Sequence, residues 1–320
     1  MDRLSSLTLD RRAFVLGSAL AAGAFVSPLG ARTTTIAERR VLWAANVRTK
    51  PFLERIAAAQ EGGFTHMSVF PIDYRMWVEQ GLKPAEMRRA LRQSGVKVLA
   101  IDPFVQWVPG FEIPSAYPAE NRGFIDFDEE QIFRIADELE AEALNCVEGL
   151  GQPHERARLV DAFGKVADRA AARGLRVTLE FMPISSIPDL ASGWPIVAGV
   201  DRANAGLCFD TWHHYRSTPD DALLATIPGS KIFEVQLADA LTERRGKDLV
   251  EDLLRYRMLP GEGELPIASA VANLRAIGAL HSVGPEVFAD AMDAIDSVRV
   301  GRLAAAATQR LIGSAGFRKT

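Results

Sequence analysis

The sequence has little of the material from which several large classes of protein are built. Its 320 residues include only two cysteines, Cys146 and Cys208, both inside apolar runs, so no disulfide framework is expected. The net charge is −4 and lysine and arginine form no dense run, which argues against a nucleic-acid partner because phosphate binding needs clustered basic groups. Beyond the first thirty residues there is no apolar stretch of about 20 residues, so the mature chain should not cross a membrane.

The first 31 residues differ in composition from the rest of the chain. A pair of arginines, Arg11 and Arg12, precedes an apolar stretch over residues 13–30 that is rich in alanine and glycine. This layout is typical of a twin-arginine export signal, and cleavage is expected near Ala31. The alternative is an amphipathic N-terminal helix, but the apolar stretch has no polar face. We therefore expect an exported, periplasmic protein whose single domain is residues 32–320.

The remaining residues alternate short β-like runs with longer helical stretches. Alternation of this kind favours a parallel sheet, and eight units fit a (β/α)8 TIM barrel, which needs roughly 250 residues. An open, doubly wound sheet is the alternative, but residues 45–49 (ANVRT) are not the glycine-rich phosphate turn expected after its first strand. The predicted strands are residues 41–47, 64–70, 96–102, 143–149, 175–181, 205–210, 231–237 and 282–288.

Polar residues end the last four predicted strands. They are Glu180, Asp210, Gln236 and Glu286. Active sites of such barrels lie at the C-terminal ends of the strands, so the four side chains should converge on one rim. Three bare carboxylates would repel one another, and oxygen ligands suit a hard dication, so we expect Mn²⁺, with Mg²⁺ or Co²⁺ as alternatives. Each acid could instead cap the helix after its strand.

Three further features are open to two interpretations each. Glu148, after the fourth strand, could contact substrate or form hydrogen bonds at the barrel rim. Asp102 ends the third strand and could belong to the site, but a helix or loop cap is favoured. The aromatic side chains of residues 104–117 could form a lid, or they could pack against a neighbouring subunit of a homo-oligomer.

Five segments carry a resemblance to a known family. The chain resembles the sugar phosphate isomerase/epimerase superfamily of xylose isomerase-like TIM barrels over most of residues 41–300. The matching segments are TLEFMP (178–183), LCFDTWHHY (207–215), FEVQLADA (233–240), LPGEGELP (259–266) and GPEVF (284–288).

The resemblance implies roles for individual residues. The family's metal ligands fall on the four strand-end residues, and its two catalytic carboxylates fall on Glu180 and Glu286, on opposite sides of the metal. A catalytic or substrate-binding histidine falls on His213, which could act as an acid because the ordinary pKa of histidine lies near neutrality. A substrate-binding arginine falls on Arg257.

The third ligand departs from the pattern of many epimerases. Gln236 stands where they have histidine, and a neutral amide oxygen suits Mn²⁺ or Mg²⁺ better than Zn²⁺. The motif Gln-Leu-Ala-Asp is similar to that of the 3-dehydroshikimate dehydratase branch.

The resemblance thus implies an isomerase or epimerase of a sugar, keto-sugar or cyclitol that works through an enediolate. A metal-dependent dehydratase and a non-catalytic exported sugar-binding protein are the alternatives, and in each case the partner is a small polyhydroxy compound. An apurinic endonuclease shares the scaffold but would need more histidine ligands and a basic face.

Overall fold

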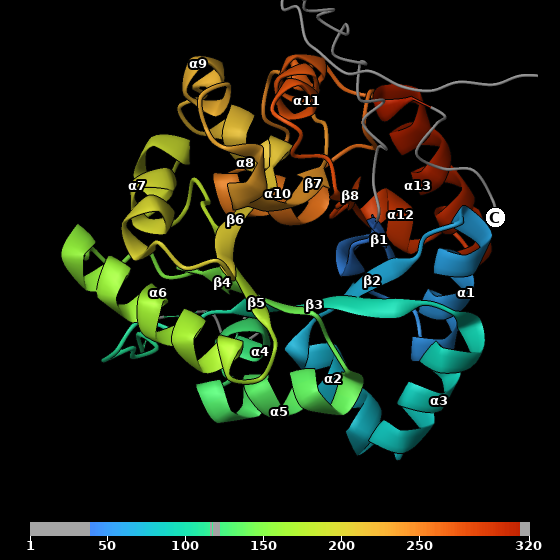
Figure 1. The fold of residues 1–320 in the computed structure, drawn as a ribbon. Helices are drawn as coiled ribbons and strands as arrows, with labels where there is room; N and C mark the ends of the chain where they lie inside the picture. The colour runs from blue at the N-terminus through green and yellow to red at the C-terminus, as the bar shows by residue number, and fades with distance from the viewer. Residues whose placement is uncertain (1–38, 116, 118–121, 314–320) are drawn as a thin grey trace, which may run out of the picture. The chain divides into compact units, whose positions relative to one another are not determined.

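The computed structural model describes residues 39–115, 117 and 122–313, so the predicted export signal lies outside the described residues. Eight parallel strands form a closed barrel in chain order, with helices around it (Figure 1). This confirms the predicted TIM barrel and excludes the open sheet. The strands are β1 (Arg39–Leu42), β2 (His66–Val69), β3 (Lys97–Phe104), β4 (Ala143–Val147), β5 (Arg176–Glu180), β6 (Ala205–Asp210), β7 (Ile232–Leu237) and β8 (Ser282–Pro285).

Helices follow the strands and turn their apolar faces toward the barrel. In α5, for example, the Asp128 side chain accepts a hydrogen bond from the backbone N–H of Gln131, and the buried positions recur at helical spacing. The α-helices are α1 (Phe52–Gly62), α2 (Pro71–Glu79), α3 (Pro84–Ser94), α4 (Arg122–Ile125), α5 (Glu129–Leu139), α6 (Arg156–Ala171), α7 (Leu190–Val200), α8 (Thr211–Arg216), α9 (Asp221–Leu224), α10 (Leu249–Arg255), α11 (Ile267–Ala276), α12 (Asp290–Asp293) and α13 (Ser297–Ile312). Two 3₁₀ helices are η1 (Ala44–Val47) and η3 (Gly229–Lys231).

The barrel closes between its first and last strands. Arg39 pairs with Ser282 and Arg40 with Val283. At this seam a Cβ on Gly284 would lie 1.7 Å from the carbonyl oxygen of Val41, so the close approach of the two backbones requires glycine. The seam brings the last strand, and the residues that follow it, beside the first.

The first and the last predicted strands end well before their predicted C-terminal residues. The strand predicted over residues 41–47 ends at Leu42, and η1 follows it. The amide of Asn46 explains the turn, since its Nδ2 donates to the carbonyls of Trp43 and Pro285 and so satisfies backbone groups that a strand would have paired. The strand predicted over residues 282–288 ends at Pro285, whereas β3 continues past its predicted end to Phe104.

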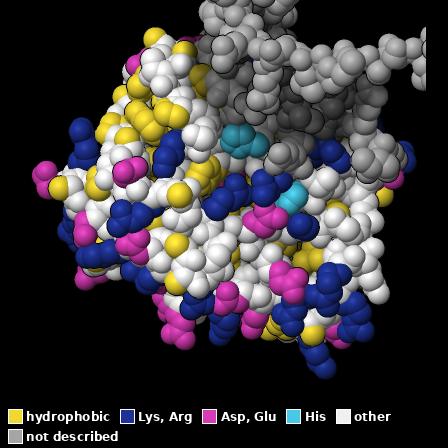
Figure 2. All heavy atoms as spheres, viewed as in Figure 1, with side chains coloured by type: hydrophobic (Ala, Val, Ile, Leu, Met, Phe, Trp, Pro, Cys, Tyr) yellow, Lys and Arg dark blue, Asp and Glu magenta, His cyan; other side chains and the backbone are white. Residues whose placement is uncertain are grey.

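The described surface carries mixed charge. On the face drawn in Figure 2, acidic and basic side chains are interspersed, and no broad patch of one sign appears among its described residues. Of the helices in the described part of the chain, none is long and apolar enough to cross a bilayer.

Candidate active site

Four strands deliver the predicted ligand residues to one end of the barrel. Glu180, Asp210 and Gln236 lie at the C-terminal ends of β5, β6 and β7, and Glu286 follows β8. All four side chains are buried. The Gln236 amide Nε2 donates to Glu286 Oε1 over 3.2 Å. The alternative interpretation of the acids as helix caps also holds for one of them. Asp210 Oδ1 accepts from two backbone N–H groups at the start of α8 and leaves Oδ2 for the site.

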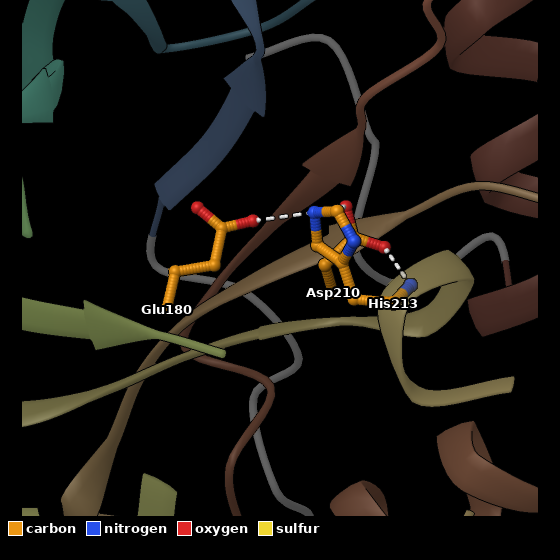
Figure 3. A group of neighbouring side chains, drawn as sticks. All are labelled: Glu180, Asp210 and His213. Carbon is orange, nitrogen blue, oxygen red and sulfur yellow. Dashed lines mark hydrogen bonds and ion pairs between the residues drawn. The ribbon is translucent and has the colours of Figure 1, made fainter. Parts of the chain in front are cut away.

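His213, one turn into α8, points at the acids (Figure 3). Its Nε2 lies 3.1 Å from Glu180 Oε1 and 3.7 Å from Asp210 Oδ2. Burial lowers the pKa of His213 to about 3 despite the nearby charge of Asp210, so the imidazole is neutral near pH 7. With so low a pKa the ring is a poor base and is not an imidazolium acid, so the geometry favours a role in orienting Glu180 through a hydrogen bond. Burial, which sequence cannot measure, disfavours the role as an acid.

Arg257 joins the acids to the histidine. Its Nη1 donates to Asp210 Oδ2 over 2.7 Å and to Glu286 Oε2 over 3.2 Å. Its Nη2 lies 3.3 Å from His213 Nε2, and its Nε donates to the carbonyl of Leu253. Every nitrogen of this buried guanidinium therefore has a protein partner. The prediction that Arg257 binds substrate stays a prediction, because the side chain is already committed to the candidate ligands.

The site holds more negative charge than Arg257 can balance. Burial, and then the charge of Asp210, raises the pKa of Glu180 to about 8. Burial also raises the pKa of Glu286 well above its ordinary value, although Arg257 opposes the shift. Burial acts on Asp210 in the same sense, but Arg257 and His213 outweigh it and hold the pKa of Asp210 below its ordinary value. Without a further cation, therefore, the glutamates tend to keep a proton.

The donor set fits a divalent metal. Gln236 Oε1, beside the three carboxylates, is buried and has no hydrogen-bond partner among the described residues. This neutral oxygen is therefore available to bind a metal. Such oxygens are what Mn²⁺ and Mg²⁺ prefer. A second grouping is also close: ligand atoms of Glu180, Asp210 and His213 all lie within 4.8 Å of one another. The two sets share Glu180 and Asp210 and differ in whether a nitrogen takes part.

Two residues that sequence analysis did not assign to the site belong beside it. Asn145 Nδ2 donates to Glu180 Oε2 over 2.5 Å and to Asp102 Oδ1 over 2.9 Å. Asp102 was expected to cap a loop; that expectation is wrong, because it lies within β3 with its carboxylate buried among the acids. Burial, and then the charge of Glu180, raises its pKa well above the ordinary value. The only sequence signal was a polar residue inside each of two apolar strands.

Glu148 is placed elsewhere. Its carboxylate accepts hydrogen bonds from four backbone N–H groups, those of Leu150, Gly151, Gln152 and Ser186. It thereby ties the loop after β4 to the loop after β5, and it is not among the residues that line the cavity over the acids. The geometry favours the rim hydrogen-bonding interpretation of Glu148 over substrate contact.

A cavity of about 150 Å³ lies over the acids and opens to solvent. The charged side chains and the histidine on its lining are Asp102, Glu180, His213, Arg257 and Glu286. The other lining residues come from the ends of β2, β3, β4 and β5, from α4 and α10, and from the segment after β8, and they are largely apolar. The cavity is where a small substrate would meet the site.

Comparison with known proteins places the chain in a family. A model of the xylose isomerase-like TIM barrel family matches residues 56–307, so the chain belongs to that family, as the sequence motifs suggested. A 3-dehydroshikimate dehydratase of Pseudomonas aeruginosa is 31% identical over 244 residues, which are 74% of this chain and 36% of the dehydratase. An inosose isomerase of Bacillus licheniformis is 27% identical over 135 residues, covering 42% of this chain and 47% of the isomerase.

A solved structure shows the same fold. The crystal structure of a protein called IOLI, with a bound zinc atom, superposes with a TM-score of 0.72 at 17% identity and covers 88% of this chain and 100% of the other. At that identity the likeness concerns the fold alone. The matched part of this chain spans about 36% of the length of the dehydratase. The dehydratase and the inosose isomerase are named as enzymes.

Proposed function

We propose that this chain is a divalent-metal-dependent isomerase or epimerase that removes a proton next to the carbonyl of a small sugar, keto-sugar or cyclitol. One observation carries the proposal: Glu180, at the end of β5, and Glu286, just after β8, are buried carboxylates that line the same cavity. Two carboxylates on one cavity can serve as the base and the acid of a proton transfer at the carbon beside the carbonyl.

Four residues are proposed as metal ligands, and two of them are also proposed to move the proton. Glu180, Asp210, Gln236 and Glu286 would hold the metal, proposed to be Mn²⁺ with Mg²⁺ or Co²⁺ as alternatives. A bound divalent cation would supply Lewis acidity that polarises the substrate carbonyl.

Proton movement falls to Glu180 and Glu286. Either carboxylate can take a proton from the carbon beside the carbonyl. The neutral His213, with Nε2 3.1 Å from Glu180 Oε1, can orient that carboxyl group through a hydrogen bond. Arg257 Nη1 donates to both Asp210 and Glu286 and so holds the two carboxylates beside one another.

A dehydratase is the second candidate. One support is the 31% identity to a 3-dehydroshikimate dehydratase. The other is Gln236, which begins a Gln-Leu-Ala-Asp motif similar to that of the dehydratase branch. In this case one carboxylate removes the proton and a second, protonated group donates to the departing hydroxyl. Because His213 is neutral, a glutamic acid whose pKa is raised is the better donor.

Metal analysis combined with deuterium exchange tests the proposal. Full-length protein is purified without chelator, its metals are measured, and candidate hydroxy-ketones are followed by NMR in deuterium oxide. Exchange without loss of water supports the isomerase or epimerase, and loss of water supports the dehydratase. Glu180→Gln and Glu286→Gln should abolish exchange, while Glu142→Gln, at the opposite end of the barrel, should not. The proposed site would be overturned if the purified protein held no metal and neither Glu180→Gln nor Glu286→Gln changed the rate of exchange.

Export is proposed alongside the activity. The support is the paired arginines followed by an apolar stretch within residues 1–31. Replacing Arg11 and Arg12 by lysine should leave the protein in the cytoplasm of a bacterial host, as measured by fractionation. Unchanged export of the double variant would contradict the assignment.

A further inference from the structure

The cavity over the acids has a polar floor and apolar walls. Three aromatic rings form one wall: Phe70 stacks on Phe288 with centroids 5.9 Å apart, and Phe124 meets Phe70 edge-on at 5.5 Å. Aliphatic side chains from the loops after β3 and β5 and from α10 line the rest. Apart from the floor, Tyr117 is the one polar side chain among the described residues on the lining.

This lining is poorly matched to a ligand that carries hydroxyls all round. Each hydroxyl that leaves water needs a hydrogen-bond partner, and leaving one unpaired weakens binding. The floor can hold the adjacent hydroxyl and carbonyl oxygens on which the chemistry acts. Against the wall of Phe70, Phe124 and Phe288 any further hydroxyl meets carbon.

The lining is also poorly matched to an anion. Among the described lining residues Arg257 is the one lysine or arginine, and its nitrogens are engaged by Asp210, Glu286, His213 and a backbone carbonyl. Asp102 adds one more acid to the floor. Away from the proposed metal, a carboxylate or phosphate on the substrate would thus find no free cationic side chain among the described lining residues.

We propose that the cavity binds an uncharged cyclic hydroxy-ketone with an apolar ring face, which packs on Phe70, Phe124 and Phe288 while the hydroxy-ketone edge meets the acids. The volume agrees, since an apolar cavity of roughly 150 Å³ accommodates a benzene-sized ring. This substrate class rests on the proposed proton abstraction and replaces the sugar, keto-sugar or cyclitol of that proposal by a less hydroxylated ring. It separates the chain from relatives named for inosose and dehydroshikimate.

Three six-membered ring ketones test the inference on the metal-loaded, full-length protein. They share the hydroxy-ketone edge and differ in the rest of the ring: 2-hydroxycyclohexanone is apolar there, inosose is hydroxylated, and 3-dehydroshikimate carries a carboxylate. Dissociation constants are measured by titration calorimetry, and solvent deuterium exchange is measured on the same samples. We expect 2-hydroxycyclohexanone to bind at least about tenfold more tightly than the other two, the factor that one lost hydrogen bond represents.

A variant pair assigns the preference to the aromatic wall. Phe124→Ser should reduce the affinity ratio several-fold, while Phe111→Ser, at a similarly half-buried phenylalanine that does not line the cavity, should leave it unchanged. Equal or tighter binding of inosose or 3-dehydroshikimate would overturn the substrate class, and so would an unchanged ratio in Phe124→Ser. Exchange of those two ketones would in that case leave the proposed function standing. Preferential binding of 2-hydroxycyclohexanone with no exchange of any ketone would instead overturn the proposed function and leave the binding preference intact.

Discussion

Replacing Arg257 by methionine removes the cation that the site carries within its own chain. The guanidinium is 1% exposed, and its partners Asp210 and Glu286 are 0% and 4% exposed, so the substitution leaves two carboxylates in the interior without their counter-charge. Breaking a buried ion pair by removing one partner costs about 3–5 kcal/mol. For a domain of this size the melting temperature of the metal-free protein should fall by roughly 6–20 °C.

A divalent metal should recover part of that loss. A metal at a hundred times its dissociation constant stabilises any folded protein that binds it by about 2.7 kcal/mol. In Arg257→Met the gain should be larger by about 1–2 kcal/mol, because the metal then meets two unpaired carboxylates and no neighbouring cation. The assay is the melting temperature of both proteins in EDTA and across a manganese titration.

Arg216→Met is the matched control. Arg216 forms a comparably buried pair with Asp252, 3.0 Å apart, away from the cavity. It should lower the melting temperature but leave the increment due to metal as in the parent protein. If manganese stabilises Arg257→Met no more than it stabilises the parent, Arg257 and the metal do not share the same carboxylates, and the proposed ligand set is refuted.

Three other predictions concern single residues. The hydrogen bond from His66, together with Arg39, holds the pKa of Glu142 at about 2, below its ordinary 4.5, so the ionised form stabilises the fold above pH 4.5 and loses this effect as the pH falls toward 2. Glu142→Gln should therefore cost about 1–2 kcal/mol in urea unfolding at pH 7, after allowance for partial exposure, and progressively less below pH 4.5; an equal cost at pH 7 and pH 3 would contradict this. Asn145→Leu should lower the rate of deuterium exchange about 10–100-fold with little change in melting temperature, because it removes the amide that orients Glu180; an unchanged rate would count against that role. Gln236→His should shift the metal retained after dialysis against equal manganese and zinc toward zinc, and an unchanged ratio would argue against Gln236 as a ligand.

The convergence of the four strand-end residues could be predicted because the barrel rule depends only on which end of each strand a residue occupies. Strand ends at the C-terminal rim face the same space whatever the details of packing, so Glu180, Asp210, Gln236 and Glu286 converge as expected. Asp210 shows that the two interpretations of a strand-end acid need not compete, since one oxygen caps α8 while the other faces Arg257.

Residues that depend on side-chain direction could not be predicted. Glu180 pairs with Val147, so Glu148 lies one residue further along its strand direction than Glu180 does. Because successive side chains of a strand point in opposite directions, the Glu148 carboxylate turns to the backbone of two loops instead of to the site. Asn145 and Asp102 lie inside apolar strands, where only the assembled interior shows that an amide links two acids. The neutral state of His213 likewise follows from burial, which no spacing of residues reveals.

The seam between β1 and β8 has a consequence for biosynthesis. The last strand closes the barrel, and Glu286 stands immediately beyond it, so the chain must leave the ribosome past Glu286 before the site can be assembled. A nascent chain that has emerged only as far as β7 offers three of the four proposed ligands on a sheet that cannot yet close. Complete capture of the proposed metal should therefore wait until β8 has emerged and the barrel has closed.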